Sequence, residues 1–153
     1  MRVFGACINE TLQIYPAAPG ALSCVVPQGG ATVSGHWVPG GTRVYTSPLA
    51  MFRSSASFHD PDSFLPEQWY TETEEKVATD DRDALKPFSV GTKDCVGEYM
   101  VNYLIRFCTR EVMLHFDFEP CGESEEWVSN RKIWTFWDKP PLMVKLTPVK
   151  PHV

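Results

Sequence analysis

Long apolar runs are missing from this sequence. Its 153 residues are 43% hydrophobic, yet no stretch of about 18 consecutive apolar residues offers a membrane span. The N-terminal residues also lack the apolar segment of a secretory signal. The rest of the composition is typical of a globular chain and excludes disordered and fibrous classes. We therefore expect a cytoplasmic protein whose residues 1–153 form a single domain.

An excess of positive charge is missing too. The formal net charge is −5 at pH 7. Nucleic-acid binding needs a clustered basic face, so we expect no nucleic-acid partner. The four histidines are not spaced as ligands of one metal site, and no Ser-His-Asp arrangement indicates hydrolysis.

Closely spaced cysteine pairs are the third absence. No C-x-x-C pair occurs, which excludes a zinc ribbon and a thioredoxin-type site. An odd number of cysteines in a cytoplasmic chain also argues against a disulfide framework. The five cysteines are Cys7, Cys24, Cys95, Cys108 and Cys121.

The first half of the chain carries short periodic segments. Apolar residues at helical spacing predict a helix over 4–15, which ends at Pro16. The β-prone runs 21–26 and 31–38 are separated by a Pro-Gln-Gly-Gly turn, which predicts that they pair as a hairpin. A third run follows at 42–47, and residues 48–53 fit a single helical turn.

The second half contains one long helix between irregular segments. Residues 54–86 lack periodicity and predict an irregular stretch pinned to a surface by its aromatic residues. Its acidic run is expected to be a solvated loop. A Gly-bearing loop at 87–97 leads into an amphipathic helix that reaches about residue 115. The apolar runs 133–137 and 142–146 predict a closing hairpin.

Cys95 lies at the entrance of the long helix, between Gly91 and Gly97. The unpaired N–H groups of a helix N-terminus lower the pKa of a thiol and favour the thiolate. Flanking glycines let the backbone approach a flat partner closely. These features suit a thiolate ligand of heme iron. Cys95 alone also fits a cysteine that only fills space at a helix start.

The residues around Cys95 decide between these interpretations. Residues 88–97 resemble the heme-binding loop of the cytochrome P450 family, F-x-x-G-x-R-x-C-x-G, with Lys93 in place of arginine. Residues 10–13 are similar to the family's E-x-x-R, and residues 60–69 to its D-P-x-x-F-x-P-E-R-W. Residues 140–146 resemble its final β-hairpin. The likeness covers nearly the whole chain and is closest to fungal members of secondary metabolism.

The resemblance implies an α+β fold, the C-terminal part of the cytochrome P450 fold. That part comprises a K-like helix, a small antiparallel sheet, a meander, the cysteine loop, an L-like helix and a closing hairpin. It implies a heme cofactor with Cys95 as the axial thiolate ligand of iron, which favours O–O cleavage. The heme-binding residues would be Phe88, Gly91, Lys93, Cys95 and Gly97. The family activity is monooxygenation, supported by an NADPH-dependent reductase.

Several positions depart from the family pattern. Gln13 and Gln68 stand where the family has the two arginines that pair with the glutamate of E-x-x-R, here Glu10. Losing one side of a buried ion pair typically costs about 3–5 kcal/mol. We therefore expect the Glu10 carboxyl to be protonated or to reach solvent. Cys24 replaces an arginine that reaches a heme propionate, and Glu98 replaces a basic residue that docks the reductase.

These departures leave three functional hypotheses. The first is a truncated P450-like protein without the distal oxygen-activating helix, weakly active or inactive alone and without catalytic residues of its own. The second is one half of a split enzyme whose N-terminal half is separately encoded. The third is a heme-free cyclase-like or scaffold protein.

Overall fold

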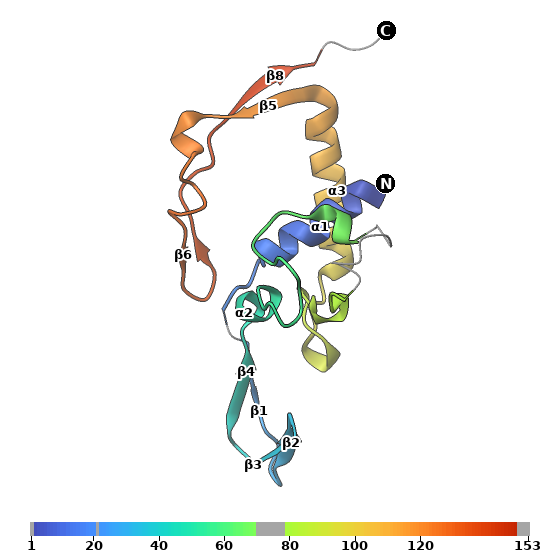
Figure 1. Ribbon diagram of the computed structural model, residues 1–153, viewed down its shortest axis with the longest axis vertical. Coiled ribbons are helices and arrows are strands. Elements are labelled where there is room, and N and C mark those ends of the chain that lie inside the picture. The colour runs from blue at the N-terminus through green and yellow to red at the C-terminus, as the bar shows by residue number, and fades with distance from the viewer. Residues whose placement is uncertain (1, 21, 70–78, 150–153) are drawn as a thin grey trace. The chain divides into compact units, whose positions relative to one another are not determined.

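The computed structural model describes residues 2–20, 22–69 and 79–149. It divides into two compact units. The first unit is Met1–Pro87 together with Ile133–Trp137, and the second is Phe88–Lys132 together with Asp138–Val153. Helices and two-stranded antiparallel sheets make up the described part (Figure 1). This mixture agrees with the expected α+β class.

Helix α1 (Arg2–Ile14) opens the first unit and confirms the helix expected over 4–15. Its buried face carries Ala6 and Ile8 beside two polar residues, Glu10 and Gln13. Pro16 comes two residues after Ile14, the last residue of the helix, and a proline cannot continue the backbone ladder of a helix. The helix end is therefore encoded locally, whereas the polar buried face needs partners from elsewhere in the unit.

The strands of the first unit pair differently from the expectation. β1 (Leu22–Val25) pairs with β4 (Arg43–Thr46), while β2 (Ala31–Val33) pairs with β3 (His36–Val38). The predicted hairpin between runs 21–26 and 31–38 is therefore wrong. The reason is the turn at Ser34 and Gly35, whose φ angles are 48° and 80°. Two successive positive φ values suit a two-residue hairpin, so run 31–38 folds back on itself.

Helix α2 (Pro48–Phe52) confirms the helical turn expected after the third strand. Ser47 caps it by accepting a hydrogen bond from Ala50 N, and proline occupies the first turn, where its missing N–H is harmless. The short 3₁₀ helices η1 (Pro66–Trp69) and η2 (Arg82–Ala84) follow in otherwise irregular chain.

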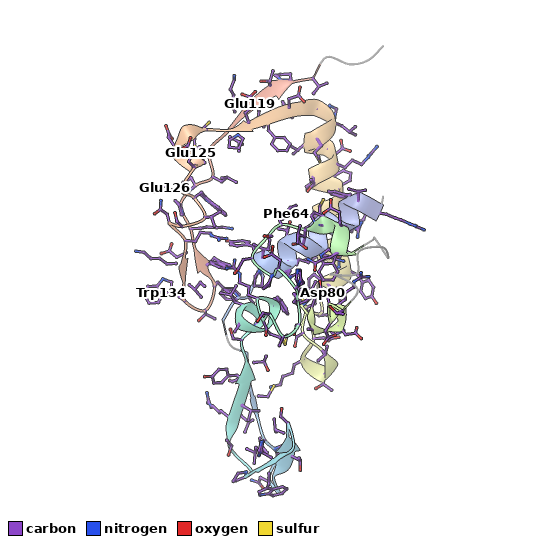
Figure 2. All side chains as sticks on the ribbon, viewed as in Figure 1. Phe64, Asp80, Glu119, Glu125, Glu126 and Trp134 are labelled. Carbon is purple, nitrogen blue, oxygen red and sulfur yellow. The ribbon has the colours of Figure 1, made fainter. Side chains whose placement is uncertain are left out.

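The irregular stretch is held by only some of its aromatic residues. Phe58 is buried and lies against Trp69 with ring centroids 6.2 Å apart. Phe64, labelled in Figure 2, is 55% exposed, so it does not pin the segment as expected. Asp80 accepts a hydrogen bond from His59 N at 2.8 Å, which closes the loop. Tyr70 and the first half of the acidic run, Glu72, Glu74 and Glu75, lie outside the described residues.

The second unit is built on helix α3 (Glu98–His115), which follows the 3₁₀ turn η3 (Gly91–Lys93). The helix confirms the expected amphipathic segment. β5 (Phe116–Pro120) continues from it and pairs with β8 (Val144–Pro148). Between them lies the 3₁₀ turn η4 (Gly122–Ser124). Ser124 Oγ donates to Met143 O and accepts from Met143 N, which ties this loop to the chain before β8.

The predicted closing hairpin between runs 133–137 and 142–146 is wrong. β6 (Lys132–Ile133) pairs with β7 (Trp137–Asp138) instead, and β8 belongs to β5. Trp134 N donates to Phe136 O at 3.0 Å, so the first run turns back on itself. The second run follows two prolines that cannot donate ladder hydrogen bonds.

Candidate functional site

The cysteine loop is closed by a backbone hydrogen bond. Cys95 N donates to Phe88 O at 2.9 Å, and Asp94 N donates to Gly91 O at 3.2 Å. The loop therefore returns to its starting point within eight residues and turns directly into α3. The Cys95 thiol is exposed, while Phe88 is half-buried. The structure thus brings together all five residues that the sequence indicated, Phe88, Gly91, Lys93, Cys95 and Gly97.

Two glycines shape this loop for different reasons. Gly91 has φ +81°, in the left-handed region that disfavours other residues. No atom lies within 4 Å of the place where its Cβ would stand, so the requirement is conformational. Gly97 is the N-cap of α3, and a Cβ there would lie 3.9 Å from Cys95 Sγ. The sulfur therefore stands close to bare backbone at the helix start.

The side chains of the loop suit a metal ion whose coordination positions are already filled, for the most part, by a non-protein group. In the described ranges 2–20, 22–69 and 79–149, no three His, Cys, Asp or Glu side chains gather as a metal site. Cys95 offers one exposed thiol in the loop. Lys93, on η3, supplies an exposed cation in the same loop. Porphyrin iron, which needs axial protein ligands only, suits such a site.

Helix α3 presents an extensive apolar surface beyond the loop. None of its residues is buried. Its first three turns expose a run of large apolar side chains, which are Tyr99, Met100, Tyr103, Leu104 and Phe107. Further along, the helix and the β5–β8 sheet border an open, shallow apolar hollow of about 310 Å³. The residues lining this hollow are Cys108, Thr109, Val112, Met113, Phe118, Val144 and Leu146.

A second polar cluster lies in the first unit, where the family motifs of α1 and η1 meet. Glu10 and Gln13 are fully buried, and Gln68 is 3% exposed. Gln68 Nε2 donates to Glu10 Oε2 at 2.6 Å and to Gln13 Oε1 at 3.1 Å. Gln13 Nε2 donates to Phe52 O at 3.2 Å, which adds α2. We call Glu10, Gln13 and Gln68 the amide latch.

The amide latch corrects one part of the expectation for Glu10, that its carboxyl reaches solvent. Its carboxyl does not reach solvent, although no cation faces it among the described residues. Instead Leu65 N donates to Oε1 at 2.8 Å, and Trp69 Nε1 donates to Oε2 at 2.6 Å. Together with Gln68, three N–H groups surround the carboxyl. All three partners are N–H donors, and the two carboxyl oxygens of Glu10 accept from them.

Sequence reasoning missed two of these donors. The Leu65 amide carries no side-chain signal, but Trp69 stands one residue after Gln68 and could have been read as an N–H donor. Cys24, considered as a replaced propionate ligand, lies exposed on β1 opposite Val44, in the first unit. All five cysteines are free.

Comparisons with known proteins show which family and which proteins the chain resembles. The family model for cytochrome P450 matches residues 1–146. A cytochrome P450 monooxygenase of Aspergillus aculeatus is 46% identical over 143 residues, 94% of this chain and 27% of the relative. Averantin hydroxylase of Aspergillus parasiticus is 38% identical over 146 residues, 94% of this chain and 29% of the relative.

The chain belongs to the cytochrome P450 family. A further monooxygenase of the family, from Stereocaulon alpinum, is 41% identical over 145 residues, 95% of this chain and 28% of the relative. The expected likeness to fungal members of secondary metabolism is confirmed. The chain spans somewhat over a quarter of the length of these relatives. None of the described helices combines the length and apolar character that crossing a bilayer requires.

Proposed function

We propose that the cysteine loop binds heme and that Cys95 is the axial thiolate ligand of its iron. The observation that carries the proposal is the loop closed by Cys95 N and Phe88 O at 2.9 Å, which leaves the thiol exposed at the start of α3. Helix N-termini favour thiolate over thiol. The chain's membership in the cytochrome P450 family supports the same assignment.

The other loop residues serve the same partner in this proposal. Gly91 and Gly97 keep Cβ atoms away from the porphyrin side of the loop, and Phe88 anchors the loop through its carbonyl. Lys93 offers its ammonium to a heme propionate. It supplies a single charge without the two-pronged geometry of arginine, so it holds the propionate less firmly.

A bound heme supplies one-electron and O₂ chemistry, which an axial thiolate biases toward O–O cleavage. The chain's own contribution is to hold the thiolate and to keep bulky side chains off the loop. We propose monooxygenation of a small secondary metabolite as the activity of the complete family fold. An NADPH-dependent reductase would supply the electrons, and Glu98 would weaken its docking, because a carboxylate replaces a cation there.

We further propose that this activity needs parts of the family fold beyond residues 1–153. The unburied α3 supports this, because an 18-residue helix with exposed aromatic residues is typically covered in a folded protein. The covering part could belong to the same polypeptide or to a separately encoded N-terminal half. With reductase and NADPH, we expect residues 1–153 alone to oxidise no added substrate.

Heme titration of the purified chain tests the main proposal. The reduced carbonyl complex should show the Soret position of a thiolate ligand, and Cys95→Ser should abolish it. Cys108→Ser is the matched control, since Cys108 is also an exposed cysteine of the second unit. A Soret band that persists in Cys95→Ser, or the absence of any heme uptake, would overturn the assignment and favour the heme-free scaffold hypothesis.

A further inference from the structure

The strands β5 and β8 form a sheet by themselves, so each has one edge that no other described strand covers (Figure 1). All residues of β8, Val144–Pro148, are exposed. An isolated two-stranded sheet is only marginally stable, and the unpaired N–H and C=O groups of a free edge are a template for a further strand. The two edges of this sheet are therefore candidate surfaces for strand addition.

The hydrogen bonds at the two ends of the pair fix which backbone groups point outward. Val149 N donates to His115 O at 2.9 Å, and Cys121 N donates to Met143 O at 3.0 Å. Hydrogen-bonded and non-hydrogen-bonded positions alternate along an antiparallel pair. The odd-numbered residues of β8 therefore direct their N–H and C=O groups toward β5, and the even-numbered residues direct theirs toward the free edge.

The free edge of β5 is poor in hydrogen-bond donors. Its outward positions are Phe116, Phe118 and Pro120, by the same alternation. The Phe116 N–H is already used, because it donates to Val112 O at the end of α3, and a proline has no N–H. One outward donor is left on β5, whereas the free edge of β8 offers two N–H donors and three carbonyls. Strand addition is therefore favoured at β8.

A second copy of the same strand fits the free edge of β8 in antiparallel pairing about Leu146. The Leu146 residues of the two copies then exchange both hydrogen bonds, and the Val144 N–H of each copy meets the Pro148 carbonyl of the other. A two-fold axis relates the copies and closes the assembly at two. The adjacent register would set two Lys145 residues directly opposite, which like charges disfavour. Pairing about Leu146 sets Lys145 opposite Thr147 of the second copy.

The side chains on both faces of the sheet suit this pairing. On one face Leu146 lies opposite Phe118, and the two residues are 49% and 51% exposed. Pairing continues this apolar row into the second copy, beside the hollow that Phe118, Val144 and Leu146 line with α3. On the other face Lys145 Nζ lies 3.8 Å from Glu119 Oε2. The cation at the edge of β8 thus has a carboxylate beside it in its own copy.

We infer that the free edge of β8 is a self-association surface, at which two copies of this chain pair residues 144–148 into a four-stranded sheet of order β5–β8–β8–β5. A second copy is favoured over an unrelated strand, because the sequence of β8 supplies both its own register and an uncharged partner for Lys145. The interface is short, so we expect a Kd of about 10–100 μM. The inference does not depend on heme at Cys95.

Sedimentation equilibrium of the full chain, at concentrations on both sides of this Kd, tests the inference. Leu146→Pro removes an outward N–H and an apolar side chain but no hydrogen bond to β5, and an edge position tolerates proline. It should weaken dimerisation at least about tenfold. The matched control is Phe118→Pro, which makes the same change at the directly opposed position of β5 and should leave the Kd unchanged.

Thr147→Lys tests the register without introducing a proline. The new cation lies opposite Asp117 in its own copy, which keeps the β5–β8 pair, but opposite Lys145 in the second copy. Dimerisation should weaken about fivefold, because two pairs of like charges then face each other. Thr147→Gln, a side chain of similar length without the charge, should leave the Kd unchanged.

Amide hydrogen exchange locates the contact by residue. A higher protein concentration should slow exchange at Val144 and Leu146 and leave the outward Phe118 amide fast. Three results would overturn the inference. They are a parent chain that stays monomeric well above the expected Kd, equal effects of Leu146→Pro and Phe118→Pro, and a dimer that Tyr99→Ser/Tyr103→Ser dissociates, which would assign the association to α3.

Discussion

The two units differ in how they bury their side chains. Among the described residues, the buried apolar side chains all lie in the first unit; they are Ala6, Ile8, Pro16, Pro19, Val26, Phe52 and Phe58. In the described part of the second unit, Ser124 is the only buried residue. The unit that lost the family's buried cations is therefore the better packed one. The unit that kept the cysteine motif exposes its helix.

This difference shows that the two family motifs of the chain, the amide latch and the cysteine loop, retain different properties. The amide latch preserves structure, because Gln68, Leu65 and Trp69 supply N–H donors where the family uses cations. The cysteine loop preserves local geometry, because one backbone hydrogen bond and two glycines suffice to form it. Structural order and cofactor chemistry thus depend on different residues, and each can be tested alone.

Glu10→Ala should produce the largest loss of stability, in the first unit. It removes the acceptor of three N–H donors, of which the Gln68 amide is buried and the Leu65 and Trp69 groups are partly buried. Each donor left unpaired costs about 1–3 kcal/mol. We expect the free energy of unfolding to fall by about 4–6 kcal/mol in total. Urea denaturation measures the loss, and hydrogen exchange in α1 locates it.

The control for this variant is Asn9→Ala, which changes an exposed neighbour on the same helix. It should shift the unfolding free energy by less than about 0.5 kcal/mol. Wild-type exchange rates in α1 of Glu10→Ala would contradict the role of the latch. The milder Glu10→Gln keeps one acceptor oxygen, so it should fall between the two if Glu10→Ala does not fold.

A matched pair of phenylalanines tests the contrast in burial. Phe58 is 1% exposed in the first unit, whereas Phe107 is 49% exposed on α3. Phe58→Ala should cost about 3–5 kcal/mol, because it leaves a cavity. Phe107→Ala loses an i,i+4 contact with Tyr103, whose ring centroid is 6.0 Å away, which is worth about 0.2–0.5 kcal/mol.

The urea concentrations at which Phe58→Ala and Phe107→Ala are half unfolded give the comparison of their stabilities directly. A cost for Phe107→Ala as large as that for Phe58→Ala would mean that α3 is covered in solution. The difference between the two units would then disappear.

Gln68→Ala should have a smaller effect than the loss of Glu10. It removes one of three donors to the carboxyl and leaves Gln13 Oε1 without its hydrogen bond. We expect a loss of about 1–3 kcal/mol in unfolding free energy. Gln68→Arg is the informative companion, since it restores the family's cation beside Glu10. If Gln68→Arg is less stable than Gln68→Ala, the buried space beside Glu10 and Gln13 accommodates an amide but not a guanidinium group.

Much of the site was predictable from the sequence because its causes are local. The helix boundaries follow from prolines and apolar spacing, and the loop at 88–97 is closed by residues within one short segment. The prediction of strand pairing was wrong for both expected hairpins. The turn at Ser34 and Gly35 lay inside a β-prone run, and the distant partnership of β5 with β8 has no local signal.

The prediction that the Glu10 carboxyl reaches solvent was wrong for a related reason. All three of its donors, Leu65 N, Gln68 Nε2 and Trp69 Nε1, come from more than 50 residues away. A substitution of arginine by glutamine shows that a charge is lost. It does not show that the Leu65 backbone, just before η1, and the Trp69 indole approach closely enough to replace it.

Gly91→Ala should have a modest effect on stability but a selective one on the site. An L-residue at φ +81° is strained by about 1–2 kcal/mol, and the open space around Gly91 adds no steric clash. Because the loop must hold this conformation to present Cys95, the heme affinity should fall about fivefold to tenfold, measured by titration. Gly29→Ala introduces the same kind of strain at φ +110° in the first unit. An equal fall in heme affinity there would mean that the loop's conformation is not what Gly91 contributes.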